Sequence, residues 1–212
     1  YIKRKNKRFY NRFFSMLKTF IGITSSNTYI WCRKGACFLI DPSDHLETIV
    51  ETLKDKHLQG IVLTHAHADH MHLLASFDVP IYLHEQDFQL LKKPAHMGYL
   101  EGFPFKLHDL NIVKMPKRLQ LEDLEIHIIH TPGHSPGSIC MYAGDILISG
   151  DTLFKESIGR TDLYLASDMM MKQSIIQLMT LPNDTKIYPG HGEKSTIRHE
   201  KSHNSFIKRW LK

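Results

Sequence analysis

Apolar and polar positions change along this chain in short segments, and most segments have the pattern of a strand. In the first half, apolar runs bounded by Gly, Pro, Asn or Asp predict strands at residues 18–23, 27–32, 36–40, 60–63 and 80–83. Before the fourth run, Asp44 followed by Glu47 predicts the capped start of a helix. The apolar stripe of this helix consists of Leu46, Ile49, Val50 and Leu53. Strand, helix and strand in this order predict a right-handed crossover onto one sheet.

The second half also mixes strands with helices. Apolar runs predict strands at residues 119–121, 124–130, 138–142, 146–149 and 185–188, with hairpin turns at 122–123 and 144–145. Helical spacing predicts helices at residues 168–179 and 196–212, and shorter ones at 71–77 and 85–92. Residues 94–110 contain several Gly and Pro and predict an irregular loop, which is either a lid or substrate wall or an ordinary surface loop.

Composition and charge narrow the class of protein. A chain of 212 residues with 42% hydrophobic content predicts one domain with a core. No apolar run approaches the roughly 18–20 residues that a membrane-spanning helix needs. The net charge of +5 lies in residues 1–15, which hold six basic side chains and no acid, whereas residues 16–212 hold 21 basic and 22 acidic side chains. We therefore predict a basic, flexible arm at 1–15 and one domain at 16–212, with the arm either inert, a targeting segment, or a site for anionic lipid or RNA.

The cysteines add a prediction about the compartment. Cys32, Cys37 and Cys140 are odd in number and form no C-x-x-C pair. This pattern argues against a disulfide framework and predicts a cytoplasmic protein with reduced thiols. Cys32 and Cys37 flank a turn and could face each other across a hairpin, but we expect buried free thiols.

The most distinctive polar cluster is Thr64-His65-Ala66-His67-Ala68-Asp69-His70. It begins where the apolar run at 60–63 ends, so it follows a predicted buried strand. In an extended chain, side chains at 65, 67 and 69 point to the same side. Imidazole nitrogen and carboxylate oxygen are preferred ligands of borderline divalent metals such as Zn²⁺. The cluster therefore predicts a metal site.

Three later turns each offer a further His or Asp among small residues. They are Thr131–Gly137, which contains His134, Ser149–Thr152, which contains Asp151, and Pro189–Gly192, which contains His191. The order HAHADH, TPGHSPGS, SGDTLF and YPGHG resembles the metallo-β-lactamase superfamily, and the segment SIGRTD at 157–162 is similar to the short bacterial glyoxalase II-like hydrolases. The resemblance implies an α/β (α+β) fold, a four-layer αββα sandwich in which the ligand loops meet at one edge of two packed sheets.

The resemblance also implies a ligand set and a reaction. One divalent ion would be held by His65, His67 and His134, the other by Asp69, His70 and His191, and Asp151 would bridge them. Two ions, Zn²⁺ or alternatively Fe or Mn, would supply a shared hydroxide that attacks a carbonyl. Asp69 would both bind metal and orient this nucleophile, so it is the predicted catalytic residue. The arrangement predicts a binuclear metal-dependent hydrolase.

The substrate expected from the resemblance is a small thioester such as an acylglutathione. Members that cleave lactams commonly have Cys or Ser at the position of Asp151, which disfavours antibiotic hydrolysis. Only 21 residues follow His191, too few for the C-terminal domain that holds glutathione in full-length glyoxalase II, so the thiol carrier stays open. Arg160 either binds a substrate carboxylate or pairs internally with Asp162.

Two other activities remain open at this point. Persulfide dioxygenases share the fold and a similar GRTD segment, and use one Fe(II), which here would be held by His65, His134 and Asp151. The superfamily also includes nucleases, but these usually carry an inserted domain or clamping arm for which this chain shows no room. We therefore expect no membrane partner and no nucleic-acid partner apart from the basic arm, and the sequence leaves the oligomeric state undetermined.

Overall fold

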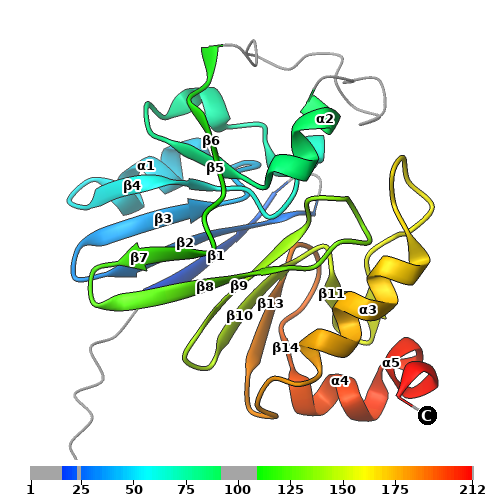
Figure 1. The fold of residues 1–212 in the computed structure, drawn as a ribbon. Helices are drawn as coiled ribbons and strands as arrows, with labels where there is room; N and C mark the ends of the chain where they lie inside the picture. Colours follow the sequence, from blue (N-terminus) through cyan, green and yellow to red (C-terminus); the bar gives the residue numbers. More distant parts are fainter. Residues whose placement is uncertain (1–15, 23–24, 92–108, 212) are drawn as a thin grey trace, which may run out of the picture.

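The computed structural model describes residues 16–22, 25–91 and 109–211. The predicted arm at 1–15 and most of the predicted loop at 94–110 lie outside these residues, and both stay predictions. Strands of the described part form two six-stranded sheets and one two-stranded sheet. Figure 1 shows the two large sheets face to face, with helices on their outer sides.

The first sheet has the strand order β1-β2-β3-β4-β5-β6, so neighbours in space are neighbours in sequence. Its strands are β1 (Met16–Ile21), β2 (Asn27–Arg33), β3 (Ala36–Ile40), β4 (His57–Val62), β5 (Ile81–Leu83) and β6 (Ile112–Lys114). The first three strands are antiparallel, and β3 to β6 are parallel. Helix α1 (Leu46–Leu53) connects β3 to β4, which confirms the predicted strand-helix-strand unit.

The second sheet has the order β14-β13-β10-β9-β8-β7. Its strands are β7 (Arg118–Leu121), β8 (Leu124–His130), β9 (Ile139–Ala143), β10 (Ile146–Gly150), β13 (Lys186–Pro189) and β14 (Ser195–Thr196). The small sheet pairs β11 (Leu153–Phe154) with β12 (Ser157–Ile158). The remaining helices are α2 (Phe88–Leu91), α3 (Asp168–Leu178), α4 (Ile197–His203) and α5 (Ser205–Trp210), with 3-10 turns at Ala68–His70, Leu74–Ser76 and Glu85–Asp87.

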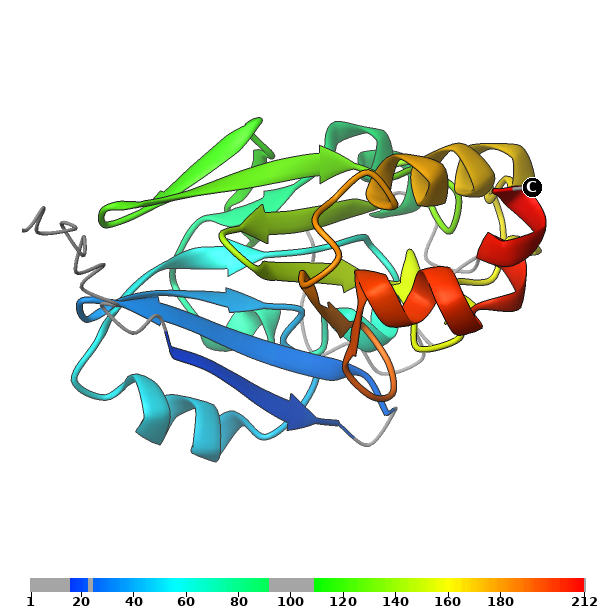
Figure 2. The ribbon, with the colours of Figure 1, turned by 90° about the horizontal axis from the view of Figure 1, so that it is seen from below.

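Alternation along β2 and β3 explains why the layers form. Tyr29 and Trp31 pack between the two sheets, whereas Ile30 and Cys32 pack on the opposite face. Helix α1 packs on the outer face of the first sheet through Ile49. Helices α3 to α5 pack on the outer face of the second sheet. Because both faces of each sheet are buried, the described chain forms helix, sheet, sheet and helix layers, visible from below in Figure 2. The predicted four-layer αββα fold is confirmed.

The start of α1 differs from the prediction. His45, not Asp44, is the N-cap, in a left-handed conformation (φ 64°), and its side chain makes no capping bond. The Asp44 carboxylate instead accepts a hydrogen bond from the His45 amide at 2.6 Å. Leu46 and Val50 are 37% and 51% exposed, so only Ile49 and Leu53 of the predicted stripe are buried.

Gly60, the first residue of the strand predicted at 60–63, lies inside β4, which already begins at His57. A Cβ atom at this position would be 2.8 Å from both the Pro80 carbonyl oxygen and the Tyr82 ring. The glycine therefore allows β5 to approach β4 closely. Residues 71–77 also differ from the prediction, because they contain a 3-10 turn at Leu74–Ser76 in place of a helix.

The predicted helix at 196–212 is divided into α4 and α5 by Asn204. The Asn204 side chain accepts hydrogen bonds from the amides of Phe206 and Ile207 at 3.1 and 3.4 Å, so it caps α5. Its amide group donates to Glu200 at 2.9 Å. An asparagine whose side chain satisfies a new helix start favours an interruption over continuous helix.

Cys32 and Cys37 form a disulfide, so the prediction of free thiols was wrong for this pair. The two residues are direct cross-strand partners in the β2–β3 hairpin, which places their side chains on the same face of the sheet. Cys140 is buried and is the free cysteine. The cysteine pattern therefore gives no support to the predicted cytoplasmic location. Among the described residues, no helix has both the length and the apolar content needed to cross a membrane.

A buried carboxylate, Asp87, joins loops from the two halves of the fold. Its oxygens accept hydrogen bonds from the amides of Ala66 and Gly137, at 2.9 and 2.5 Å, and from the Ser135 hydroxyl at 2.7 Å. Burial raises the pKa of Asp87, while the bonds from Ser135 and the amides oppose this shift. Asp87 therefore fixes the loop after β4 against the loop after β8.

We predict that Asp87→Ala lowers the free energy of unfolding by about 3 kcal/mol, because buried amide and hydroxyl donors lose their acceptor. The measurement is urea unfolding followed by circular dichroism. Asp78→Ala is the matched control, because Asp78 is exposed and lies shortly before β5, the strand that Asp87 follows. This variant should change the free energy of unfolding by less than about 0.5 kcal/mol. Equal stabilities of the two variants would contradict the proposed role of Asp87.

Candidate metal centre

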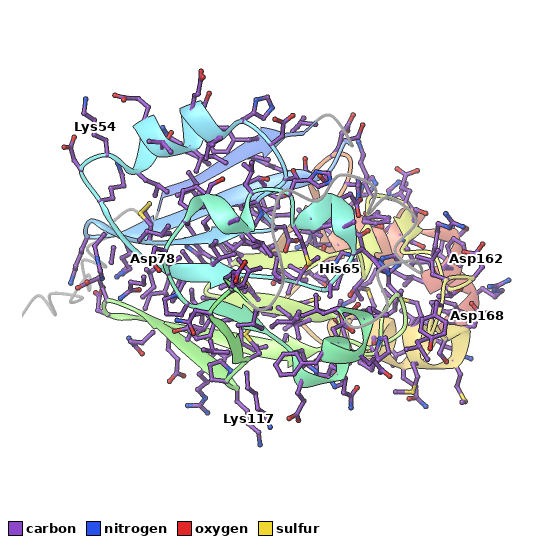
Figure 3. All side chains as sticks on the ribbon, turned by 90° about the horizontal axis from the view of Figure 1, so that it is seen from above. Lys54, His65, Asp78, Lys117, Asp162 and Asp168 are labelled. Atoms are coloured by element: carbon purple, nitrogen blue, oxygen red, sulfur yellow. A yellow bond between two sulfur atoms is a disulfide. The ribbon has the colours of Figure 1, made fainter. Side chains whose placement is uncertain are left out.

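The predicted ligand loops follow four strands whose carboxyl ends meet at one edge of the sandwich. The HAHADH segment follows β4, the loop with His134 follows β8, and Asp151 directly follows β10. His191 follows β13, which runs parallel to β10. Figure 3 places His65 inside the molecule, among the side chains between the layers. The structure thus brings together residues that are up to 126 positions apart in sequence, from His65 to His191.

His65, His67 and His134 form the first group of potential ligands, with one donor atom of each within 4.8 Å of the others. The closest pair is His67 Nδ1 and His134 Nε2, at 2.8 Å. The three rings have centroid separations of 4.6 to 4.8 Å. This is the set predicted to hold the first ion.

Asp69, His70 and His191 form the second group. His191 Nε2 is 3.2 Å from Asp69 Oδ2 and 3.3 Å from His70 Nε2. His70 Nε2 is 3.7 Å from the same Asp69 oxygen. These residues are the set predicted to hold the second ion.

Asp151 lies between the two groups. Its Oδ2 atom is 3.5 Å from both His134 Nε2 and His191 Nε2, and its Oδ1 atom is 3.5 Å from His70 Nε2. His65 Nε2 is 4.0 Å from Oδ2. One carboxylate therefore reaches both groups, as a bridging ligand must.

Two features of this donor set fit bound divalent ions. Ligands at Zn–N or Zn–O distances near 2.0 Å around a tetrahedral ion lie roughly 3.3 Å apart, close to most of the separations above. In addition, His65 Nε2 and Asp151 Oδ1 are buried and have no hydrogen-bond partner among the described residues. Buried polar atoms without partners are rare and costly, and a metal bond would satisfy both of these.

Hydrogen bonds behind the site fix the orientation of four imidazoles. Nδ1 of His65 contacts the Thr64 hydroxyl at 3.1 Å. The other three Nδ1 contacts are to Asp41 Oδ2 from His70 (3.1 Å), to the Arg160 carbonyl from His134 (2.9 Å), and to the Ser25 carbonyl from His191 (3.0 Å). These contacts leave Nε2 of each ring facing the centre, an arrangement typical of metal-ligating histidines.

Asp41, the residue directly after β3, is a neighbour of the site that was not among the predicted site residues. It is buried, with φ 48°, and accepts from the Thr64 amide and hydroxyl at 2.8 and 2.7 Å as well as contacting His70. Asp41 also belongs to a third potential ligand group, with His65 and His70. Since β3 and β4 are parallel neighbours, an Asp at the end of β3 lies beside the HAHADH loop. The position of Asp41 directly after a predicted strand was the signal that could have identified it.

Two glycines make room for Asp151. A Cβ atom at Gly190 would overlap the Asp151 carboxylate, and one at Gly159 would overlap the Asp151 carbonyl oxygen. Both positions belong to motifs used in the sequence analysis, YPGHG and SIGRTD. Gly190 is required by its close approach to the Asp151 carboxylate, and Gly159 by its close approach to the Asp151 backbone carbonyl.

The electrostatics differ between the two groups. Burial and, to a lesser extent, neighbouring imidazoles lower the pKa of His65 and that of His67, the latter to about 3. Burial opposes protonation of His70 and His191 as well, but carboxylates overcome it: Asp151 and Asp41 raise the pKa of His70, and Asp69 and Asp151 raise that of His191. Burial opposes ionisation of Asp69 and Asp151, yet adjacent histidines lower the pKa of both carboxyls.

Arg160 contributes to the site through its backbone, since its carbonyl binds His134. Its guanidinium forms a bidentate ion pair with Asp162 at 2.9 and 3.0 Å, and both side chains are about 70% exposed. The internal pair left open by the sequence is therefore present. The predicted contact of Arg160 with substrate stays a prediction.

Comparison with known proteins gives relatives over nearly the whole chain. The probable metallo-hydrolase of Streptococcus pyogenes is 35% identical over 216 residues, covering 93% of this chain and 92% of that protein. The hydroxyacylglutathione hydrolase GloC of Haemophilus influenzae is 32% identical over 191 residues, covering 84% and 90%. The names of these two relatives both describe hydrolases.

Solved structures show the same fold. The BLEG-1 B3 metallo-beta-lactamase superposes with a TM-score of 0.79 and 34% identity, covering 91% of this chain and 99% of that one. TTHA1623, solved in a di-iron-bound form, superposes with a TM-score of 0.77 and 31% identity, again covering 91% and 99%. The family model of the metallo-beta-lactamase superfamily matches residues 21–191, a range that contains every predicted metal ligand, and the chain therefore belongs to this superfamily.

Proposed function

We propose that this protein is a binuclear metal-dependent hydrolase that cleaves a thioester such as an acylglutathione. The observation that carries the binuclear part is the position of Asp151, whose two oxygens reach both groups of histidines. The thioester part is supported by the relative from Haemophilus influenzae that is named a hydroxyacylglutathione hydrolase. The proposal keeps the seven predicted ligands in their predicted roles.

His65, His67 and His134 would hold one ion, Asp69, His70 and His191 the other, and Asp151 both. When bound, two divalent ions lower the pKa of a water molecule toward neutrality and polarise a carbonyl group. Imidazole and carboxylate donors suit Zn²⁺, Fe²⁺ and Mn²⁺, and TTHA1623 was solved in a di-iron-bound form. Zn²⁺ remains our first expectation for this chain, with iron and manganese as alternatives.

Asp69 is the residue we assign to orienting the attacking water. Its side chain is 27% exposed, in contrast to the nearly covered Asp151, so substrate and water reach it. The pKa of Asp69 is held low by His191 and His70, so this carboxylate is ionised at neutral pH and accepts hydrogen bonds. Its backbone carbonyl accepts from the Ser26 hydroxyl at 2.8 Å, which fixes the loop that carries it.

Two other reactions are tested alongside thioester cleavage. The 34% identity to BLEG-1 favours a β-lactam as the second candidate substrate. The aspartate at position 151 argues against it, because members that cleave lactams commonly have Cys or Ser there. Persulfide oxygenation would need one Fe(II) at His65, His134 and Asp151. The Asp151 Oδ2 atom lies 3.5 Å from His134 Nε2 and 4.0 Å from His65 Nε2. The nuclease hypothesis rested on nuclease members of the superfamily and on the basic residues 1–15, and these residues lie outside the described chain.

We predict that purified protein binds about two divalent ions per chain, and that Asp151→Ala lowers both metal content and activity. Because the carboxylate bridges both groups, the loss of activity should exceed the roughly 10–100-fold typical of residues behind a metal site. Elemental analysis and thioester turnover measure the two effects. Asp145→Ala, which removes an exposed ion pair to Lys186, is the control and should retain both. Full metal content and turnover in Asp151→Ala would remove the bridging role.

A substrate panel tests the reaction class. We predict that protein of known metal content hydrolyses S-lactoylglutathione with a higher kcat/KM than a chromogenic cephalosporin, and consumes no oxygen with glutathione persulfide. Exhaustive chelation should abolish thioester turnover, and added Zn²⁺, Mn²⁺ or Fe²⁺ should restore it. Preferred cephalosporin cleavage, or oxygen uptake with one iron per chain, would replace the proposed function by the corresponding alternative.

The pKa shifts predict that acidification removes the two ions in order. Carboxylates raise the pKa of His70 and His191, so protons compete for these ligands at higher pH than for His65 and His67, whose pKa values are lowered. Between about pH 7 and pH 5, the ion at Asp69, His70 and His191 should therefore leave first, and metal content should pass through one per chain. Elemental analysis after dialysis at each pH measures this. Loss of both ions in one step would contradict the ordering.

A further inference from the structure

A pocket of about 720 Å³ lies beside the metal centre, between the end of β12 with the segment that follows it, helix α3 and helix α5. Figure 1 shows these three segments side by side at one end of the molecule. Its wall includes Gly159, Arg160, Lys172, Phe206, Arg209 and Trp210. The volume is within the range of pockets that bind small organic ligands, roughly 300–1,000 Å³.

The pocket wall and the metal centre share one segment of chain. The Arg160 carbonyl binds Nδ1 of His134 at 2.9 Å, and a Cβ atom at Gly159 would lie 3.3 Å from Cβ of His134. Residues 159–160 thus contact His134 and also line the pocket. In Figure 3, Asp162, which follows this segment, and Asp168, the first residue of α3, lie at one end of the molecule to the right of His65.

The charges of the pocket favour an anion. Lys172 and Arg209 are exposed, and within the described chain neither side chain forms an ion pair. The one acidic side chain of the lining, Asp168, is hydrogen-bonded to the Thr161 hydroxyl. Arg160 is paired with Asp162 and is not needed for this argument. Two cationic groups therefore face the pocket without a carboxylate partner.

Aromatic rings hold one of these cations in place and add an apolar surface. The Arg209 guanidinium lies 5.7 Å from the centroid of Phe206 and 5.9 Å from that of Trp210. Both rings are half-buried and tilted against each other at 5.8 Å. Stacking on aromatic faces orients a guanidinium while leaving its N–H groups available to a carboxylate or phosphate.

We infer that this pocket receives the thiol-carrier half of the substrate, and that Lys172 and Arg209 bind an anionic group on that carrier. The inference rests on the proposed thioester hydrolysis, because it assigns the acyl half to the metal centre and the leaving thiol to the neighbouring pocket. A carboxylate-bearing peptide thiol and a phosphate-bearing thiol share this chemistry, and a neutral thiol does not.

Binding can be measured without turnover, because Trp210 is one of only two tryptophans and the other, Trp31, is fully buried. The full chain is titrated with S-methylglutathione, with desulfo-coenzyme A, and with neutral S-methyl-N-acetylcysteamine, none of which offers a free thiol to a metal. We expect at least one of the two anionic probes to change the Trp210 fluorescence saturably, and the neutral probe not to. The anionic probe that binds more tightly identifies the type of carrier.

Lys172→Ala and Arg209→Ala should each weaken this binding about tenfold, the loss expected for one charge-assisted hydrogen bond. Lys208→Ala is the matched control, since Lys208 is an exposed cation of the same helix outside the pocket lining, and its dissociation constant should equal that of the unmodified protein. Failure of both anionic probes to bind, or equal dissociation constants in all variants, would overturn the assignment of the pocket.

Kinetics separates this proposal from the proposed function. The ratio of kcat/KM for an anionic thioester over the N-acetylcysteamine thioester of the same acyl group should fall about tenfold in Lys172→Ala and Arg209→Ala, through KM. Thioester turnover without probe binding would overturn the pocket and leave the hydrolase. Specific probe binding without thioester turnover would overturn the hydrolase and leave an anion pocket beside the metal centre.

Discussion

A buried carboxylate surrounded by imidazoles is the constraint on which the rest of this structure depends. Asp151 is 7% exposed, and its oxygens lie within 3.5 Å of three histidines. Such a cluster cannot be left in an apolar interior, because unpaired polar groups cost several kcal/mol each. The fold places this cluster where strand ends from both sheets meet. Beside the carboxylate, Gly190 leaves the space that a Cβ atom would fill.

Two further buried carboxylates hold the surrounding loops, one within the first sheet and one between the two sheets. Asp41 belongs to the first sheet and fixes Thr64 and His70 from behind. Asp87 connects the loop after β4 to the loop after β8, that is, the first sheet to the second. Together they convert flexible loop segments into a rigid frame, which is what a ligand set needs for defined metal geometry.

Much of this architecture follows from local sequence. Apolar runs predicted β2, β3, β7 to β10 and β13, and helix α3 begins at the predicted residue, because each element buries its own apolar positions. Strands β11, β12 and β14 have two residues each and β6 has three, too few for a clear periodicity. The seven residues predicted as ligands lie close together in the structure, and they could be selected because His and Asp directly after apolar runs are unusual.

What the sequence could not give were contacts between distant segments. Asp87 and Asp41 look like ordinary loop residues until the loops they join are in place. The Cys32–Cys37 disulfide was missed because a count of cysteines carries no information about strand register, whereas the hairpin places the two side chains opposite each other. The pocket beside the metal centre combines α3 with α5, and neither helix alone predicts it.

The contact between the β1–β2 turn and the β13 loop has a consequence for the order in which the site matures. Asn27 donates hydrogen bonds to the carbonyls of Pro189 and Gly192, at 2.9 and 3.0 Å, and His191 is held by the Ser25 carbonyl. The earliest described hairpin thus supports the last ligand. His191 is synthesised 126 residues after His65, so the second group of potential ligands can form only once β13 and the loop that follows it have been made.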